Sequence, residues 1–324
     1  MRRRLIRADL DTAKLSIGAL RIVLVVALAL CLWTAAEAKA EPTIEHLQVP
    51  SAAMGRDIPV AFLAGGPHAV YLLDAFNAAP DVSNWVTAGA AFTTLAGKGI
   101  SVAAPAGGAY SMYTDWEQDG SRQWQTFLCD ELPNWLAANK GLAPNGHAIV
   151  GAAQGGSGAM EAATFRPDRF RYAGSMSGYL APERTGVDGA ITAGLQQFGG
   201  VDIRNMWGLP QLGRWKWHDP DVHVALLADN NTRLWIYSPG TLGCSDPAAM
   251  IGYCDQAQGS NRQFYQHYRV DGGETDIVGS IPSPGAQPVS TAATGASSDD
   301  ATAHLVDRRN VCCTPPKYRG YGFT

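Results

Sequence analysis

The segment HAIVGAAQGG, residues 147–156, has the pattern of a strand that turns sharply into a helix. An apolar run reaches Gly151, and small residues follow, as in the nucleophile elbow G-x-S-x-G, where a serine lies on a strained strand-to-helix turn. The residue at the serine position is Ala153, whose methyl group cannot attack an ester. The segment therefore predicts the backbone of a covalent catalyst without its nucleophile.

Two nearby serines are the candidates to replace the missing nucleophile. Ser157 follows within the predicted helix, where capping or packing is its simpler role, and Ser177 follows the strand-like run RYAGSM. A serine nucleophile needs a base within hydrogen-bond reach, and that base needs an orienting partner. The sequence indicates no base beside either serine, so both are weak candidates.

The elements that must position this turn are strands alternating with helices. The first two strand-like runs alternate apolar and polar residues, whereas several central runs are almost continuously apolar, as in buried parallel strands. This order predicts an α/β fold with a doubly wound, mostly parallel sheet. Helices are predicted at 128–140 and 157–165, and strands at 44–51, 57–64, 69–76, 99–106, 147–154, 171–178, 232–239 and 263–270.

The two ends of the chain differ in composition from the centre. Residues 1–40 begin with a basic leader, continue into an apolar run at 22–36 and end in AEAKA, which predicts a secretory signal cleaved near Ala38 or Ala40. The alternative is a membrane anchor, although spanning takes about 20 apolar residues. We expect one domain at 41–281, a disordered low-complexity tail at 282–324, and a protein that is secreted to the cell envelope or beyond.

Charge and cysteine content exclude several classes of partner. The formal net charge is −4 in 324 residues, and no basic run follows the leader, so we expect no nucleic-acid binding. Five cysteines follow the leader, of which Cys244 and Cys254 could pair. Cysteine and histidine are not clustered at zinc spacing, so we expect neither a metal nor a cofactor.

Several blocks, in order, carry a resemblance to a known family. LQVPSAAMGRDIPVAF, SMYTDWEQ, FLCDELPNWLAAN and NNTRLWIY are similar to segments of the secreted mycobacterial antigen 85 mycolyltransferases, and more closely to those of their non-catalytic paralogue. The likeness covers roughly residues 44–273. It implies an exported α/β-hydrolase fold. The family enzymes transfer a mycolyl group between trehalose esters through a serine acyl-enzyme with a Ser, Glu, His triad.

The resemblance also implies that this triad is lost. Ala153 stands at the serine position, and no glutamate follows NNTRLWIY, where Asp246 is the nearest relic. Glu274 stands where the family has a histidine after Gly-Gly, and His304 is the only histidine further along. We therefore expect no catalysis. The alternative activity is a residual mycolyltransferase, acyltransferase or esterase that acts on trehalose esters.

Three positions match family residues around the ligand. Asp74 follows the strand-like run VYLL, where a family aspartate helps to hold trehalose hydroxyls, and a carboxylate at a strand end faces the ligand crevice of such sheets. A structural turn cap is an equal alternative for Asp74. Asn77 replaces a family arginine, and Phe76 and Gln154 match the oxyanion-hole positions. The sequence therefore predicts a vestigial site for small sugars.

Tryptophans mark two segments as candidate contact surfaces. Trp116 and Trp124 lie in SMYTDWEQDGSRQW, and Trp217 lies in GRWKWHDP. Large amphipathic aromatics are favoured as anchors at interfaces. The alternatives are a solvated loop at the first segment and, at the second, core packing of one of Trp215 and Trp217. The resemblance implies fibronectin or another matrix protein as the partner. A structural or antigenic envelope protein without a specific ligand is a further alternative.

Overall fold

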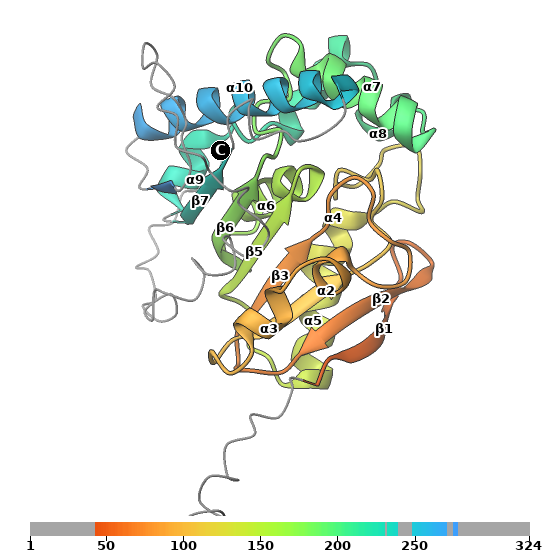
Figure 1. Ribbon diagram of the computed structural model, residues 1–324, viewed down its shortest axis with the longest axis vertical. Coiled ribbons are helices and arrows are strands. Elements are labelled where there is room, and N and C mark those ends of the chain that lie inside the picture. The colour runs from red at the N-terminus through yellow and green to blue at the C-terminus, as the bar shows by residue number, and fades with distance from the viewer. Residues whose placement is uncertain (1–42, 231, 239–247, 271–274, 278–324) are drawn as a thin grey trace, which may run out of the picture. The chain divides into compact units, whose positions relative to one another are not determined.

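A computed structural model describes residues 43–230, 232–238, 248–270 and 275–277 (Figure 1). Its centre is an eight-stranded sheet in the order β1-β2-β4-β3-β5-β6-β7-β8. The β1–β2 and β2–β4 pairs are antiparallel, and every other pair is parallel. The predicted mostly parallel α/β fold is thus confirmed. The strands are β1 Glu45–Ser51, β2 Arg56–Leu63, β3 Ala69–Leu73, β4 Ser101–Pro105, β5 His147–Ala152, β6 Phe170–Met176, β7 Arg233–Tyr237 and β8 Thr275–Ile277.

Side chains alternate between the two faces of this sheet and build a core on each. Val70 and Leu72 of β3 pack in one cluster with residues of α2 and α3, whereas Tyr71 and Leu73 belong to the cluster with α5 and α6. All five residues of β3 are buried, as expected of a central strand covered on both faces. The helices around the sheet are α2 Asn84–Thr87, α3 Ala91–Leu95, α4 Trp124–Thr126, η2 Phe127–Glu131, α5 Leu132–Lys140, α6 Gln154–Phe165, α9 Val224–Asp229 and α10 Ala248–Val270.

A third cluster is formed mainly by the segment between β6 and β7, and Met112, Trp116 and Ala257 join it from outside that segment. The helices of this segment, which we call the cap, are α7 Val187–Gly199, α8 Arg204–Trp207, η3 Pro210–Leu212 and η4 Arg214–His218. Trp207 and Trp215 are fully buried within the cluster and meet edge to face, with ring centroids 5.0 Å apart. Figure 1 shows α7 and α8 at one end of the sheet, beside α10.

One predicted strand is wrong. Residues 263–270 form the end of α10. Phe264 and Tyr268 are four residues apart, both are buried, and their rings stack at 5.9 Å, so the apolar side of this segment has the period of a helix. The other seven predicted strands and the helices at 128–140 and 157–165 are found in the structure, with small shifts at their ends.

Within the described residues, no helix is both long enough and apolar enough to cross a bilayer. Several sequence predictions lie outside these residues or rest on side chains that are not described. They are the signal at 1–40, Asp246, Glu274, His304, the Cys244–Cys254 pair and the tail at 282–324.

Candidate functional site

The predicted elbow is present and strained. Ala153 lies between β5 and α6 with φ 47° and ψ −116°, a region that non-glycine residues rarely adopt and that costs about 1–3 kcal/mol. The glycine that follows is needed for close packing, because a Cβ on Gly155 would lie 2.6 Å from the carbonyl oxygen of Leu73. The backbone therefore keeps the geometry of a nucleophile elbow although its side chain has no reactive group.

A cavity of about 370 Å³ opens beside the elbow. It lies at the carboxyl ends of β3, β5, β6 and β7, where open α/β sheets bind their ligands. Its lining residues are Asp74, Ala75, Asn84, Trp85, Ala88, Gly89, Ala152, Ala153, Met176, Ser177 and Tyr237.

Asp74 is the carboxylate in this lining, and only one of its two oxygens accepts hydrogen bonds in the described structure. Its Oδ1 accepts hydrogen bonds from the Ser83 hydroxyl at 2.9 Å and from the Asn84 N–H at 3.0 Å, which caps the turn into α2. Its Oδ2 is buried and has no partner in the described structure. Burial raises the pKa of Asp74 to about 6, although these hydrogen bonds oppose the shift. Asp74 thus caps a turn, and its second oxygen is an unused acceptor that is closed to solvent in this structure.

The two candidate serines have different surroundings. The Ser157 hydroxyl accepts a hydrogen bond from the Tyr179 N–H at 2.9 Å and is buried within α6, so its role is packing. Ser177 lines the cavity, has φ 53°, and donates its backbone N–H to the carbonyl of Tyr237 at 2.8 Å. No histidine among the described residues lines the cavity, so none of them offers Ser177 an imidazole base there.

Two described histidines pair with carboxylates, and neither pair involves the elbow. Nδ1 of His218 lies 2.7 Å from Oε1 of Glu161, and Nδ1 of His267 lies 2.7 Å from Oδ1 of Asp221. Glu161 is eight residues beyond Ala153 on α6, about 12 Å along the helix axis. His218 is therefore held too far along α6 to act as a base at the elbow.

Sequence reasoning missed the link between Glu161 and His218. Glu161 is buried, and the Thr114 hydroxyl lies 3.1 Å from the same histidine nitrogen. Trp207 stacks flat on the His218 ring, with centroids 4.5 Å apart. The available signal was a single carboxylate in the otherwise apolar helix SGAMEAATF, because a buried charge requires a partner. The pair ties α6 to the cap.

The two predicted oxyanion-hole residues do not line the cavity. The Gln154 side chain is fully buried, and its amide group donates to the carbonyls of Ala75 at 2.9 Å and Gly108 at 2.8 Å. Phe76 is half-buried and stacks on Tyr110, with ring centroids 6.1 Å apart. These side chains hold the loops around the elbow together.

The expectation that Trp116 and Trp124 offer surface anchors is wrong. Trp124 is 1% exposed and packs edge to face against Tyr113 and Phe127. Trp116 is 3% exposed, and its Nε1 donates to a backbone carbonyl of the same loop. The two tryptophans pack into the core, whereas Glu117, Gln118, Gly120 and Ser121 between them are exposed, so the solvated-loop alternative describes that part of the segment.

Trp217 alone of the three predicted anchors reaches the surface. Its side chain is 67% exposed, whereas Trp215 is fully buried and donates its Nε1 hydrogen to the carbonyl of Gly208 at 3.1 Å. This matches the alternative in which one tryptophan of the pair packs inside.

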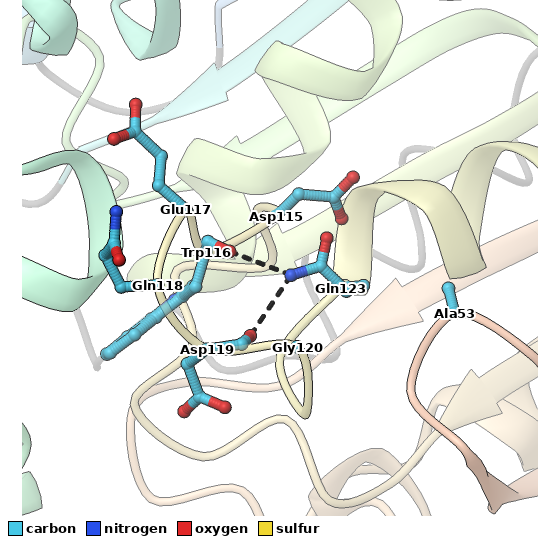
Figure 2. A pocket seen from close by; sticks show the side chains of 8 residues that line it. All are labelled: Ala53, Asp115, Trp116, Glu117, Gln118, Asp119, Gly120 and Gln123. Carbon is cyan, nitrogen blue, oxygen red and sulfur yellow. Dashed lines mark hydrogen bonds between the residues drawn. The ribbon is translucent and has the colours of Figure 1, made fainter.

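A larger cavity of about 740 Å³ lies open beside the loop at residues 115–123 (Figure 2). Figure 2 shows the amide of Gln123 reaching two backbone carbonyls of this loop, those of Trp116 at 2.8 Å and Asp119 at 3.1 Å. The lining residues are Ala53, Asp115, Trp116, Glu117, Gln118, Asp119, Gly120 and Gln123.

The carboxylates of this larger cavity are all engaged with the protein. Asp115 accepts hydrogen bonds from the Thr126 N–H at 3.0 Å and the Thr126 hydroxyl at 2.6 Å. Asp119 accepts from Arg122 at 3.2 Å, and Glu117 pairs with an arginine of the cap. Asp115 and Asp119 thus use both of their oxygens within the protein, and Glu117 is bonded through Oε2.

Comparison with known proteins gives consistent matches. The esterase family model matches residues 51–281. The chain is 73% identical over 236 residues to the MPT51/MPB51 antigen of Mycobacterium tuberculosis, covering 73% of this chain and 79% of the antigen. It is 40% identical over 250 residues to the diacylglycerol acyltransferase/mycolyltransferase Ag85B of Mycolicibacterium smegmatis, covering 72% and 76%. The crystal structure of M. tuberculosis MPT51 matches with a TM-score of 0.70 and 71% identity, covering 72% of this chain and 88% of that one.

Proposed function

The chain belongs to the esterase family that includes the MPT51 antigens and the antigen 85 mycolyltransferases, and from this premise we propose that it is an exported, non-catalytic member. In this proposal it binds small sugars in the elbow cavity and binds a host matrix protein, fibronectin, in tissue attachment. It does not transfer acyl groups.

One observation carries the proposal. The elbow keeps its strained backbone at Ala153, yet it presents a methyl group to a cavity that none of the described histidines lines. An acyl-enzyme requires a nucleophile with an adjacent base, and the described lining pairs no serine with a histidine. A strained backbone persists only where the surrounding structure over-determines it, and this is common in ligand sites.

The chemistry of the cavity supports a polyhydroxyl ligand. Oδ2 of Asp74 has no partner and is closed to solvent in this structure, so a sugar hydroxyl would use it only after the lining shifts; the bond would then be strong, because hydrogen bonds to ionised groups are about twice as strong as neutral ones. Trp85 lies in the same lining, with 4% of the residue exposed. The cavity volume of about 370 Å³ is typical of small-molecule sites.

The attachment role rests on the likeness to the family and on export. The basic leader and apolar run in residues 1–40 support export, which predicts a mature N-terminus near Glu41. Mass spectrometry of culture filtrate tests this. A mature chain that keeps residues before Arg21 would indicate an anchored protein instead.

The proposal is tested with purified mature protein in three assays. The first measures hydrolysis of a p-nitrophenyl ester and acyl transfer to trehalose, with an antigen 85 enzyme as the positive control. The second measures fibronectin capture by surface plasmon resonance, and the third measures trehalose binding by calorimetry. We expect no turnover and saturable binding of both ligands.

The matched variants are Asp74→Asn and Asp119→Asn. Loss of the charged acceptor at Asp74 should weaken trehalose binding about tenfold, whereas the second variant changes a carboxylate outside the elbow cavity and should have no effect. Turnover by the wild-type protein, or absence of both binding activities, would overturn the proposal.

A further inference from the structure

Exposed apolar side chains are concentrated in one part of the molecule. In the described structure, all six large apolar side chains that are exposed lie within residues 198–226. Five of them follow one another closely, and we call these five the apolar surface. Exposed apolar residues are usually scattered singly over a protein surface, whereas a group of them indicates an interaction site. They are Leu209, Leu212, Trp217, Val222 and Leu226.

The protein holds Trp217 outward by fixing its neighbours inward. Trp215 is buried against Trp207, and His218 is fixed to Glu161 by the 2.7 Å hydrogen bond. The tryptophan between them therefore has little freedom to fold back onto the protein. Its ring lies 6.3 Å from that of His223, in the turn that also carries Val222 and leads to Leu226. The exposure of Trp217 is thus built into the cap.

Basic side chains lie among these apolar ones. Lys216 and Arg214 are exposed on the same turn, η4. Arg214 pairs with Glu117, whereas Lys216 makes no ion pair with any described residue. Asp219 and Asp221 are buried, and Asp229 at the end of α9 is exposed. Lys216 is therefore the cation that this surface offers to an anionic partner.

The composition of this surface favours a lipid over a protein. Neither of the two cavities described above includes any of the five, so they offer no pocket for a side-chain anchor. Tryptophan, leucine and lysine together are the usual composition of a membrane-interface contact.

We propose that the apolar surface docks on an anionic phospholipid bilayer. Trp217 and Leu212 enter the boundary between headgroups and acyl chains, and Lys216 stays at the level of the lipid phosphates. This inference goes beyond the proposed function, since it gives the apolar surface a lipid partner, and assaying Trp217→Ala for both vesicle partition and fibronectin capture separates the two.

Sedimentation with phosphatidylcholine vesicles, with and without phosphatidylglycerol, tests the proposal on the full mature chain. Trp217→Ala and Leu212→Ala should each lower partition about tenfold, and Trp217→Phe should keep most of it. Lys216→Ala should lower partition about fivefold, and only on anionic vesicles. The matched control is Lys98→Ala, which removes an exposed lysine from the turn after α3 and should leave partition unchanged.

A second measurement shows whether Trp217 itself enters the lipid. Brominated lipids should quench part of the tryptophan fluorescence of the wild-type protein, and this quenching should be lost in Trp217→Phe although that variant still sediments. Equal sedimentation of Trp217→Ala and wild type, or no partition onto anionic vesicles at low salt, would overturn the proposal. Loss of fibronectin capture in Trp217→Ala with unchanged vesicle partition would assign the surface to a protein partner instead.

Discussion

The two cavities of this protein differ in what their polar groups are doing. The cavity beside the 115–123 loop has about twice the volume of the elbow cavity, yet its carboxylates are occupied by Thr126, Arg122 and the cap. The elbow cavity contains one carboxylate, Asp74, with an unpartnered oxygen, and a backbone strained at Ala153. Size alone would select the wrong site.

The difference indicates that a hydrogen-bond acceptor without a partner identifies a ligand site better than the volume of the cavity does. A buried acceptor without a partner costs about 1–3 kcal/mol, and a strained residue costs a similar amount. Both features also occur elsewhere in the described structure, but the elbow cavity brings them together in one lining, at Asp74, Ala153 and Ser177. In the larger cavity every carboxylate contributes to loop closure. The following experiments test whether this contrast is real.

The largest effect should come from adding one methyl group to a glycine next to the elbow, compared with a glycine that lines the larger cavity. In Gly155→Ala the new Cβ would lie 2.6 Å from the Leu73 carbonyl oxygen and 2.7 Å from that of Asp74, so we expect a loss of about 3 kcal/mol or more in the free energy of unfolding. In Gly120→Ala nothing lies within 4 Å of the Cβ, and the change should stay within about 0.5 kcal/mol. Urea denaturation measures the free energy of unfolding of both variants, and equal losses in the two would contradict the difference between the two cavities.

The pH dependence of stability should differ in sign between Asp74 and Asp119. The folded-state pKa of Asp74 is raised to about 6 by burial, so the unfolded chain releases this proton first and stability falls as pH rises from about 4 to 6. Asp74→Asn keeps the acceptor that Ser83 and Asn84 use. As pH rises from about 4 to 6, the free energy of unfolding of this variant should increase by on the order of 2 kcal/mol relative to wild type.

Asp119 provides the opposite case. Hydrogen bonds from Ser121 lower its pKa, with Arg122 acting in the same direction, so its contribution to stability is present above its ordinary pKa and is lost as pH falls through the lowered value. Asp119→Asn should therefore be less stable than wild type at neutral pH, and the difference should shrink below pH ~4. Thermal unfolding in a pH series measures both variants. If the stability difference from wild type changed with pH in the same direction for both variants, the environments assigned to Asp74 and Asp119 would be contradicted.

A smaller effect should reveal the strain stored at the elbow. Ala153→Gly places the residue that tolerates positive φ at φ 47°, and we expect it to stabilise the protein by about 1 kcal/mol. Ala152→Gly, one residue earlier on β5, is the control and should destabilise, because glycine weakens a strand. Destabilisation by Ala153→Gly would mean that the elbow is not strained.

The sequence predicted the local features of this fold well and the long-range ones poorly. Apolar periodicity located the sheet, and the small residues around Ala153 predicted the elbow. The segment 263–270 was misassigned because a short apolar run fits either a strand or a helix. Burial of Trp124 could not be read from composition, since an aromatic loop can face either way. The pairing of Glu161 with His218 spans 57 residues and depends on the packing of the cap on α6.

The most direct test of a non-catalytic elbow is labelling with a fluorophosphonate, followed by intact-mass and peptide mass spectrometry. This reagent forms a covalent adduct with a serine that an adjacent base activates. We predict no adduct on the wild-type protein and none on Ala153→Ser, because restoring the hydroxyl does not restore a base, while an antigen 85 enzyme in parallel is fully labelled. An adduct on Ser177 or Ser157, or on the restored Ser at 153, would contradict the account.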